Sequence, residues 1–354
     1  MQALKDLRTR DAIKQMETPD NNISQAEDYA AATQLLMSWK CPLLLSHANP
    51  DGDALGCIVG LKTMLKSQGR ESIAAVYQDP SQHQRSLTGV DDVHVLSGDD
   101  DPVFSKIDGV VVMDTCAIAQ LTPVAEWLRA KSVPRIALDH HSTRDLPADL
   151  YLIDTTASSA TLILYRWAKS AGWDISNQAA QAIFEGLATD TGWFRFSNTT
   201  PEALRAAADL IELGVNLDET NQRIYNQDPA SLLRFSSMAM SGLELHENDS
   251  IALLCVTEAM TKKAGVTPDD TGHVVNHPLS VASVGVSALL VDWGDGVTKC
   301  SFRSKGGVDV AKLAATFGGG GHVRAAGARI EAPLDDAKKM VLEKIRKRKG
   351  LAAE

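Results

Sequence analysis

Short, continuous apolar runs separated by helical patterns are the feature that most narrows the fold of the N-terminal part of this chain. Four runs predict β-strands: Pro42–Ser46, Ile73–Tyr77, Val110–Asp114 and Ile136–Asp139. Strands that are apolar along their length are buried on both faces, as in parallel sheets covered by helices. The sequence therefore predicts an α/β domain built on a parallel sheet.

Helical patterns fill the intervals between these runs and continue beyond them. Ala54–Gln68 predicts a helix that ends at Gly69. Further helices are expected at 158–170, 176–188 and 201–213, and then one or two more up to about residue 241. A smaller α/β unit follows, with strands expected at 251–256, 284–291, 298–303 and 328–330 and helices at 308–317 and 335–349.

Charge and cysteine content exclude several classes of protein. The net charge is -10, which disfavours long duplex nucleic acid because its affinity comes largely from phosphate neutralisation. No apolar run approaches the roughly 20 residues of a membrane-spanning helix, and Met1–Asn22 lacks the apolar segment of a secretory signal. The five cysteines include no close pair, which argues against a disulfide scaffold or a thiolate zinc site. We expect a cytoplasmic protein without a membrane partner.

Acidic and imidazole side chains follow the strands at the points where the strands end. His47, Asp51 and Asp53 come after the first strand, and Asp114 ends the third. The fourth runs into Asp139-His140-His141, and Asp190 follows the helix 176–188. Because ligands bind at the carboxyl ends of the strands in an open parallel sheet, we expect these groups to meet along one edge.

Converging carboxylates repel one another and need protons or cations to neutralise them. A pair of divalent ions would do so, and mostly oxygen ligands with some imidazole and no thiolate favour Mn²⁺ over zinc, iron or cobalt. Each residue alone has a structural explanation: Asp53 could cap the helix that begins at Ala54, and Asp139 could be satisfied by backbone. Their joint occurrence at strand ends favours a metal site.

These motifs, in this order, resemble the DHH phosphoesterase family. The matching segments are His47-Ala-Asn-Pro-Asp51-Gly-Asp53-Ala-Leu-Gly56, Asp114, Asp139-His140-His141 and Thr189-Asp190-Thr191-Gly192, followed by Phe317-Gly-Gly-Gly-Gly-His322, which is similar to the signature of the associated DHHA1 domain. Within that family, Thr189–Pro201 is most similar to the oligoribonuclease and pAp-phosphatase group, the NrnA type. Cys57 stands where serine is common, and Trp193 where a smaller residue is frequent.

The resemblance implies a domain organisation. Residues 1–25 would be a lead-in, 26–214 the DHH metal-binding catalytic domain, 215–245 a helical connector and 246–345 the DHHA1 substrate-binding domain. The active site would lie in the cleft between the two domains. A homodimer is also implied by resemblance.

The resemblance also implies roles for individual residues. Metal ligands would be His47, Asp51, Asp53, Asp114, His140 and Asp190, with Asp114 bridging two ions. Asp139 would orient a histidine, and His141 would contact the substrate phosphate. Two metals can lower the pKa of a shared water, so that a bridging hydroxide attacks phosphorus without a Ser or Cys nucleophile. Cys116, the thiol near this site, is interpreted as a packing residue.

Phosphate-binding groups are expected in the second domain. A glycine run allows backbone N–H groups to approach a phosphate closely, and arginine can bind it through two donors. The expected substrate-binding residues are Arg303, Lys305, Gly319, Gly320, Gly321, His322 and Arg324.

The leading hypothesis is hydrolysis of 3′-phosphoadenosine 5′-phosphate (pAp) and of single-stranded RNA fragments of a few nucleotides (nanoRNA). Cleavage of dinucleotide messengers such as c-di-AMP and pApA stays open, because the chemistry is the same. A nucleotide-binding regulatory module without catalysis is a further alternative, although every expected ligand is present. A dinucleotide-binding oxidoreductase is disfavoured, because no G-x-G-x-x-G opens the first helix.

Overall fold

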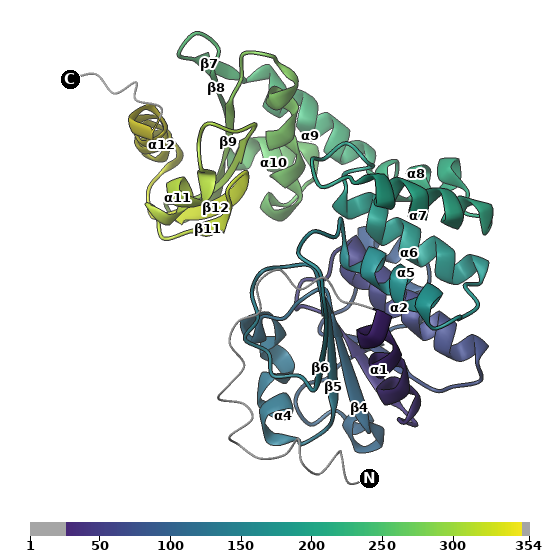
Figure 1. Cartoon of the computed structure of the whole chain (residues 1–354). Coiled ribbons are helices and arrows are strands. Elements are labelled where there is room, and N and C mark those ends of the chain that lie inside the picture. Colours follow the sequence, from purple (N-terminus) through teal and green to yellow (C-terminus); the bar gives the residue numbers. More distant parts are fainter. Residues whose placement is uncertain (1–25, 349–354) are drawn as a thin grey trace. The chain divides into compact units, whose positions relative to one another are not determined.

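The computed structural model describes residues 26–348 and divides the chain into two compact units between Gln227 and Asp228 (Figure 1). The predicted lead-in, residues 1–25, and Lys349 of the predicted last helix lie outside the described residues. None of the helices within 26–348 is long and apolar enough to cross a membrane.

The first unit is built on a 6-stranded sheet in the order β3-β2-β1-β4-β5-β6. All neighbouring strands run parallel. The strands are β1 (Pro42–Leu45), β2 (Ile73–Val76), β3 (His94–Val95), β4 (Gly109–Met113), β5 (Arg135–Asp139) and β6 (Leu150–Ile153). The predicted parallel α/β sheet is confirmed, and each of the four predicted strands agrees to within a residue at either end.

Helices cover both faces of this sheet. One face packs against α1 (Ala26–Met37), α2 (Gly52–Ser67) and α5 (Ala160–Ser170). Outside this layer, α6 (Asn177–Asp190) packs on α2 and α5, and α7 (Pro201–Glu212) packs on α5 and α6. The opposite face packs against η5 (Ile118–Val124) and α4 (Ala125–Ala130) (Figure 1). Because both faces are covered, β4 is buried at every residue, which is why its sequence is apolar throughout.

The helices begin where the sequence offers hydroxyl caps. The side chains of Ser159, Ser176 and Thr200 accept N–H bonds in the first turns of α5, α6 and α7. Pro201 occupies the first turn of α7, as its place in the sequence predicts. The described residues of this unit also include α3 (Gln82–Arg85), η3 (Val90–Asp92), η4 (Pro102–Lys106) and α8 (Leu217–Tyr225).

The second unit contains a mixed 6-stranded sheet in the order β11-β12-β10-β9-β8-β7. Its strands are β7 (Glu244–His246), β8 (Ile251–Val256), β9 (Val286–Gly294), β10 (Val297–Ser304), β11 (Gly320–His322) and β12 (Ala325–Ile330). One face packs against α11 (Val310–Ala315) and α12 (Leu334–Arg348). The other packs against α9 (Ala230–Ser241), α10 (Glu258–Ala264) and η6 (Pro268–Ser280).

Some short strands were not predicted. β3, β6 and β7 contain only two to four residues, and such short runs cannot be told from loop or helix by periodicity. The glycine run was expected to present backbone N–H groups to a phosphate, and no strand was predicted there, but Gly320–His322 forms the edge strand β11, paired with β12.

Candidate metal and phosphate site

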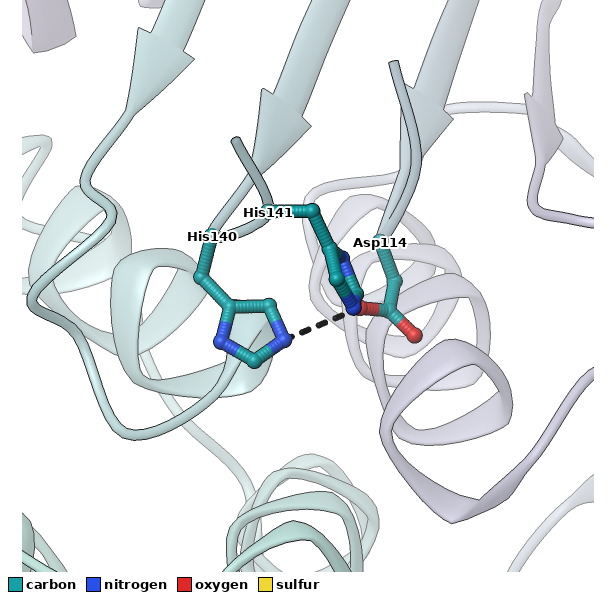
Figure 2. A group of neighbouring side chains, drawn as sticks. All are labelled: Asp114, His140 and His141. Atoms are coloured by element: carbon teal, nitrogen blue, oxygen red, sulfur yellow. Dashed lines mark ion pairs between the residues drawn. The ribbon is translucent and has the colours of Figure 1, made fainter. Parts of the chain in front are cut away.

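The carboxyl edge of the first sheet gathers the residues that the sequence singles out. His47 lies two residues beyond β1, Asp114 follows β4 directly, and Asp139 ends β5 just before His140 and His141. Figure 2 shows the rings of His140 and His141 directed towards the carboxylate of Asp114. Neighbouring parallel strands that end at the same level bring the three segments together.

Three overlapping groups of ligand atoms form at this edge, each with its atoms within 4.8 Å of one another. The groups are His47–Asp51–Asp114, Asp53–His140–Asp190 and Asp114–His140–His141. Asp114 and His140 each belong to two groups. All six residues expected as metal ligands are therefore brought together in the first unit.

Asp114 lies at the centre of this cluster. Its Oδ2 is 3.4 Å from His47 Nε2, and its Oδ1 is 3.4 Å from His140 Nε2. The residue is almost fully buried, and Oδ1 has no hydrogen-bond partner among the described residues. Its φ of +61° lies in the left-handed region, which is strained for a residue with a Cβ and is typical of functional sites.

The backbone fixes the orientation of His140. Its Nδ1 is 3.3 Å from the carbonyl oxygen of Ala157, so a proton on Nδ1 is donated there. Nε2 faces Asp114, with Asp53 and Asp190 both at 3.9 Å, and in the neutral imidazole it would carry the lone pair that binds a cation. A histidine held in this way through its other nitrogen is the usual arrangement of a metal ligand.

Two aspartates are held by helix N-termini. Asp51 is the N-cap of α2 and accepts the N–H groups of Asp53 and Ala54 at 3.0 and 3.1 Å. The alternative in which Asp53 caps α2 is thus wrong. Asp53 instead accepts bonds at the start of α5, from the N–H of Ala160 at 2.6 Å and from Thr161, whose N–H lies at 2.9 Å and whose hydroxyl lies at 2.6 Å.

Asp190 lies at the opposite kind of position, the last residue of α6. A carboxylate at a helix C-terminus is disfavoured by the helix dipole. Asn198 partly offsets this, because its Nδ2 lies 3.4 Å from Asp190 Oδ2 and donates to the carbonyl oxygens of Asp190 and Ser158 at 3.1 and 3.0 Å. Sequence reasoning missed Asn198 as a site residue and noted it only as part of the segment that leads into α7.

Asp139 contacts His141. Its Oδ1 lies 2.8 Å from His141 Nδ1 and also accepts the His141 backbone N–H at 3.0 Å. Asp139 is fully buried, whereas the His141 side chain is half exposed. The pair therefore holds an accessible imidazole in one orientation beside the cluster.

The cluster has a strong excess of negative charge. Burial and the neighbouring carboxylates Asp114 and Asp51 raise the pKa of Asp190 to about 6. Burial and Asp114 also raise the pKa of Asp51. Burial opposes the charged form of His140, but Asp114, Asp53 and Asp190 outweigh it and raise its pKa to about 10. Each shift has the direction expected where added positive charge is stabilising.

Divalent cations fit this set of donors. The unpartnered buried oxygen of Asp114, the Nε2 of His140 directed at carboxylates and the carboxylate at the end of α6 all favour a cation among them. Burial and Asp139 raise the pKa of the Cys116 thiol far above the usual range, which disfavours a nucleophilic thiolate. The thiol is buried, in keeping with packing.

In the second unit, His322 and Arg303 share one face of the sheet. Ala325 of β12 pairs with His322 of β11 on one side and with Arg303 of β10 on the other. Directly opposite residues of antiparallel strands project from the same face. Ala325, which lies between them, has only a methyl side chain and is half-buried.

Arg303 is a half-buried cation. Its Nη1 donates to the carbonyl oxygen of Phe302 at 3.0 Å, and no carboxylate in the described part of the chain pairs with it. Burial lowers the pKa of its guanidinium, as expected where a nearby anion is missing.

The remaining residues expected to bind substrate differ in what they offer. Lys305 and Arg324 are exposed, and Lys305 Nζ donates to the carbonyl oxygen of Val281 at 2.5 Å. The N–H groups of Gly318 and Gly319 donate to Ala315 and Ala314 at the end of α11, at 3.2 and 3.0 Å. These two amides are therefore already used, while Gly320 and Gly321 lie exposed in the edge strand.

Both units of the chain are similar to domains of known proteins. The N-terminal domain model of the DHH family matches residues 43–188, and the DHHA1 domain model matches 248–348. The bifunctional oligoribonuclease and PAP phosphatase NrnA of Thermus thermophilus is 33% identical over 328 residues, 90% of this chain and 94% of its own. Its namesake from Bacillus subtilis is 27% identical, over 81% of this chain and 88% of its own.

A solved structure is also similar. An exopolyphosphatase-related protein from Bacteroides fragilis superposes with a TM-score of 0.86 at 25% identity, over 92% of this chain and 98% of its own. The succession of a DHH domain and a DHHA1 domain, and the fold that they form, thus have counterparts in known proteins.

Proposed function

The chain belongs to the DHH family of phosphoesterases, and from this premise we propose that it releases phosphate from pAp and hydrolyses RNA fragments of a few nucleotides. The relatives at 33% and 27% identity carry both activities in their names. The observation that carries the proposal is the set of three ligand groups linked by Asp114 and His140, each of which belongs to two of the groups.

The proposed site also contains two divalent cations, for which Mn²⁺ is the favoured ion. His47 and Asp51 would hold one ion, Asp53, His140 and Asp190 the other, and Asp114 would bridge them. When bound, such a pair lowers the pKa of a water molecule and stabilises negative charge on a phosphoryl group.

The chain's own groups would position the substrate phosphate. His141 is accessible and is held by Asp139, so its free Nε2 can donate to a non-bridging phosphate oxygen. Donors that are fixed before the substrate arrives stabilise charge without reorganising. Asp139 would act through His141 and not on the substrate itself.

The second unit is proposed to bind the remainder of the substrate. Arg303 and His322 project from the same face of its sheet, and Arg303 lacks an anionic partner among the described residues. Lys305, Arg324 and the glycine run Gly319–Gly321 belong to the same proposal. Accordingly, we assign the catalytic domain to residues 26–214, the connector to 215–245 and the substrate-binding domain to 246–345.

One panel of substrates tests the proposal. The full chain, with Mn²⁺, is offered pAp, a dinucleotide RNA, a longer RNA, c-di-AMP and pyrophosphate. Turnover of the first two is expected. Preference for c-di-AMP would favour a dinucleotide phosphodiesterase, and binding of pAp without turnover would favour a regulatory module.

Assembly and location form a separate part of the proposal. A homodimer in the cytoplasm is expected from the family. Light scattering on the purified chain measures its mass against the 38.0 kDa of one copy, and a mass near that value would contradict the dimer.

A further inference from the structure

A tight turn links the end of α6 to the segment that leads into α7. The carbonyl oxygen of Thr191, the residue after Asp190, accepts the N–H groups of both Arg195 and Phe196 at 3.0 Å. Asn198 ties the turn back to the carbonyl oxygen of Asp190 at 3.1 Å. The turn is therefore fixed relative to a residue of the metal-binding cluster.

Backbone strain in this turn is stabilised by two aromatic anchors. Trp193 and Phe194 both have left-handed φ values, +59° and +61°. Their rings lie 5.8 and 5.9 Å from the ring of Phe184, a buried residue of the first core. Two consecutive strained residues persist only where packing holds them, and such strain is typical of functional sites.

The third aromatic residue of the turn, Phe196, points outwards. A Cβ placed on Gly192 would lie only 2.3–2.5 Å from three atoms of the Phe196 ring, so the ring packs directly on the Gly192 backbone. Yet the residue is 57% exposed. A single exposed apolar residue needs no explanation in itself. This one is held by a strained turn that begins immediately after Asp190.

We propose that Phe196 stacks on the nucleobase of the substrate nucleotide whose phosphate is bound beside Asp190. The proposal rests on the proposed function, because it assumes a nucleotide substrate. Every nucleobase has a π-face, so stacking on an aromatic side chain tolerates different sequences. A stacking residue therefore suits an enzyme that accepts both pAp and RNA fragments of mixed sequence.

The same geometry explains why glycine occupies position 192. With a φ of +56° and no Cβ, it allows the phenyl ring to lie against the backbone. The ring then has one face supported and its remaining surface open to a ligand. Arg195 is braced in the same turn, with its Nε donating to the carbonyl oxygen of Gly192 at 2.8 Å.

The test compares substrates with and without a base. KM is measured with Mn²⁺ for pAp and for the ribose 3′,5′-bisphosphate that lacks adenine. Phe196→Ala should raise KM for pAp by about tenfold, which corresponds to about 1.4 kcal/mol, within the range typical of base stacking. KM for the base-free substrate should stay unchanged, and Phe196→Trp should keep the wild-type preference for pAp.

A matched control is Leu204→Ala, which removes another exposed apolar side chain, 52% exposed, from α7. It should change neither KM. An equal effect of Phe196→Ala on both substrates, or no effect on pAp, would overturn the stacking proposal while wild-type turnover of pAp still supported the function. An inactive wild type would overturn the function itself. Should the alanine variant fail to fold, the tryptophan variant decides: loss of its preference for pAp would count against stacking.

Discussion

The carboxylate of Asp53 is bound by Thr161, which lies 108 positions later in the chain and donates both its N–H, at 2.9 Å, and its hydroxyl, at 2.6 Å. Thr161 is in the first turn of α5 and is fully buried. The N-terminus of that helix thus stabilises the charged form of a proposed metal ligand. It also orients the second carboxylate oxygen towards His140.

Replacing the Thr161 hydroxyl should weaken metal binding. Thr161→Val keeps the size of the side chain and the backbone donor but removes one bond to Asp53. Loss of a group that orients a ligand typically costs about 10–100-fold in metal affinity, which calorimetric titration with Mn²⁺ measures. Thr122→Val is the control, because the Thr122 hydroxyl is exposed and donates to the carbonyl oxygen of Ala119, away from the proposed ligands. Equal affinities in the two variants would contradict the role of Thr161.

Asp139→Asn should lower kcat for pAp by about 10–100-fold and leave KM nearly unchanged. The amide replaces the carboxylate that fixes His141 Nδ1 at 2.8 Å, so the imidazole loses its orientation and the partner of its charged form. Steady-state kinetics separate the two constants. Asp145→Asn, at an exposed position that accepts the N–H of Ile118, should behave as wild type. A variant whose KM rose while kcat held would place Asp139 in substrate binding instead.

Arg303→Ala should raise KM for pAp by about tenfold or more, since a charged hydrogen bond contributes about 1.5–3 kcal/mol. The guanidinium is half buried without a carboxylate partner in the described part of the chain, which leaves it ready to bind an anion. Lys339→Ala removes an exposed cation that pairs with Asp336 and should leave KM unchanged. An unaltered KM in Arg303→Ala would exclude it from the phosphate-binding groups.

Acid stability should depend on the ion pair between the buried carboxylate of Asp154 and the guanidinium of Arg166. Burial alone would raise the pKa of Asp154, but bonds from Thr156 and Arg166 outweigh burial and lower it. Because the pKa of Asp154 is lower in the folded protein than in the unfolded chain, where it is about 3.9, the charged carboxylate stabilises the fold at any pH above that unfolded value. This stabilisation is lost as the pH falls through the folded-state pKa. Asp154→Asn should therefore cost about 3 kcal/mol at pH 7, and the deficit should shrink towards pH 3.

Urea unfolding at the two pH values measures this difference. The control is Glu126→Gln, which breaks an exposed pair with Arg129 and should cost less than about 1 kcal/mol at either pH. A deficit for Asp154→Asn that stayed constant between pH 7 and pH 3 would contradict the assigned cause.

Local patterns predicted the parallel sheet and the ligands that follow its strands. The apolar runs fixed where the strands end, so Asp114 and His140 could be placed at one edge before any coordinates. Contacts between distant segments could not be predicted in this way. The hydrogen bonds from Asn198 to Asp190 and from Thr161 to Asp53 form only because α5, α6 and α7 pack together. Neither an asparagine nor a threonine indicates a functional site by itself.

Glycine-rich segments were also ambiguous in the sequence. If the glycine run before His322 formed a loop, its amides would be free to bind a phosphate. In the structure the run pairs with β12 as a strand, and the sequence alone does not distinguish the two conformations. The Gly319 N–H donates to the carbonyl oxygen of Ala314 at the end of α11. No local sequence pattern predicts this bond.

The central claim is that Asp114 joins two cation sites into one catalytic cluster. It is tested most directly by phosphate release from pAp as Mn²⁺ is added back to EDTA-treated wild-type chain and to Asp114→Ala. Wild type should recover turnover with added Mn²⁺, and Asp114→Ala should stay at the background rate at every concentration. Full Mn²⁺-dependent turnover by Asp114→Ala would contradict the account.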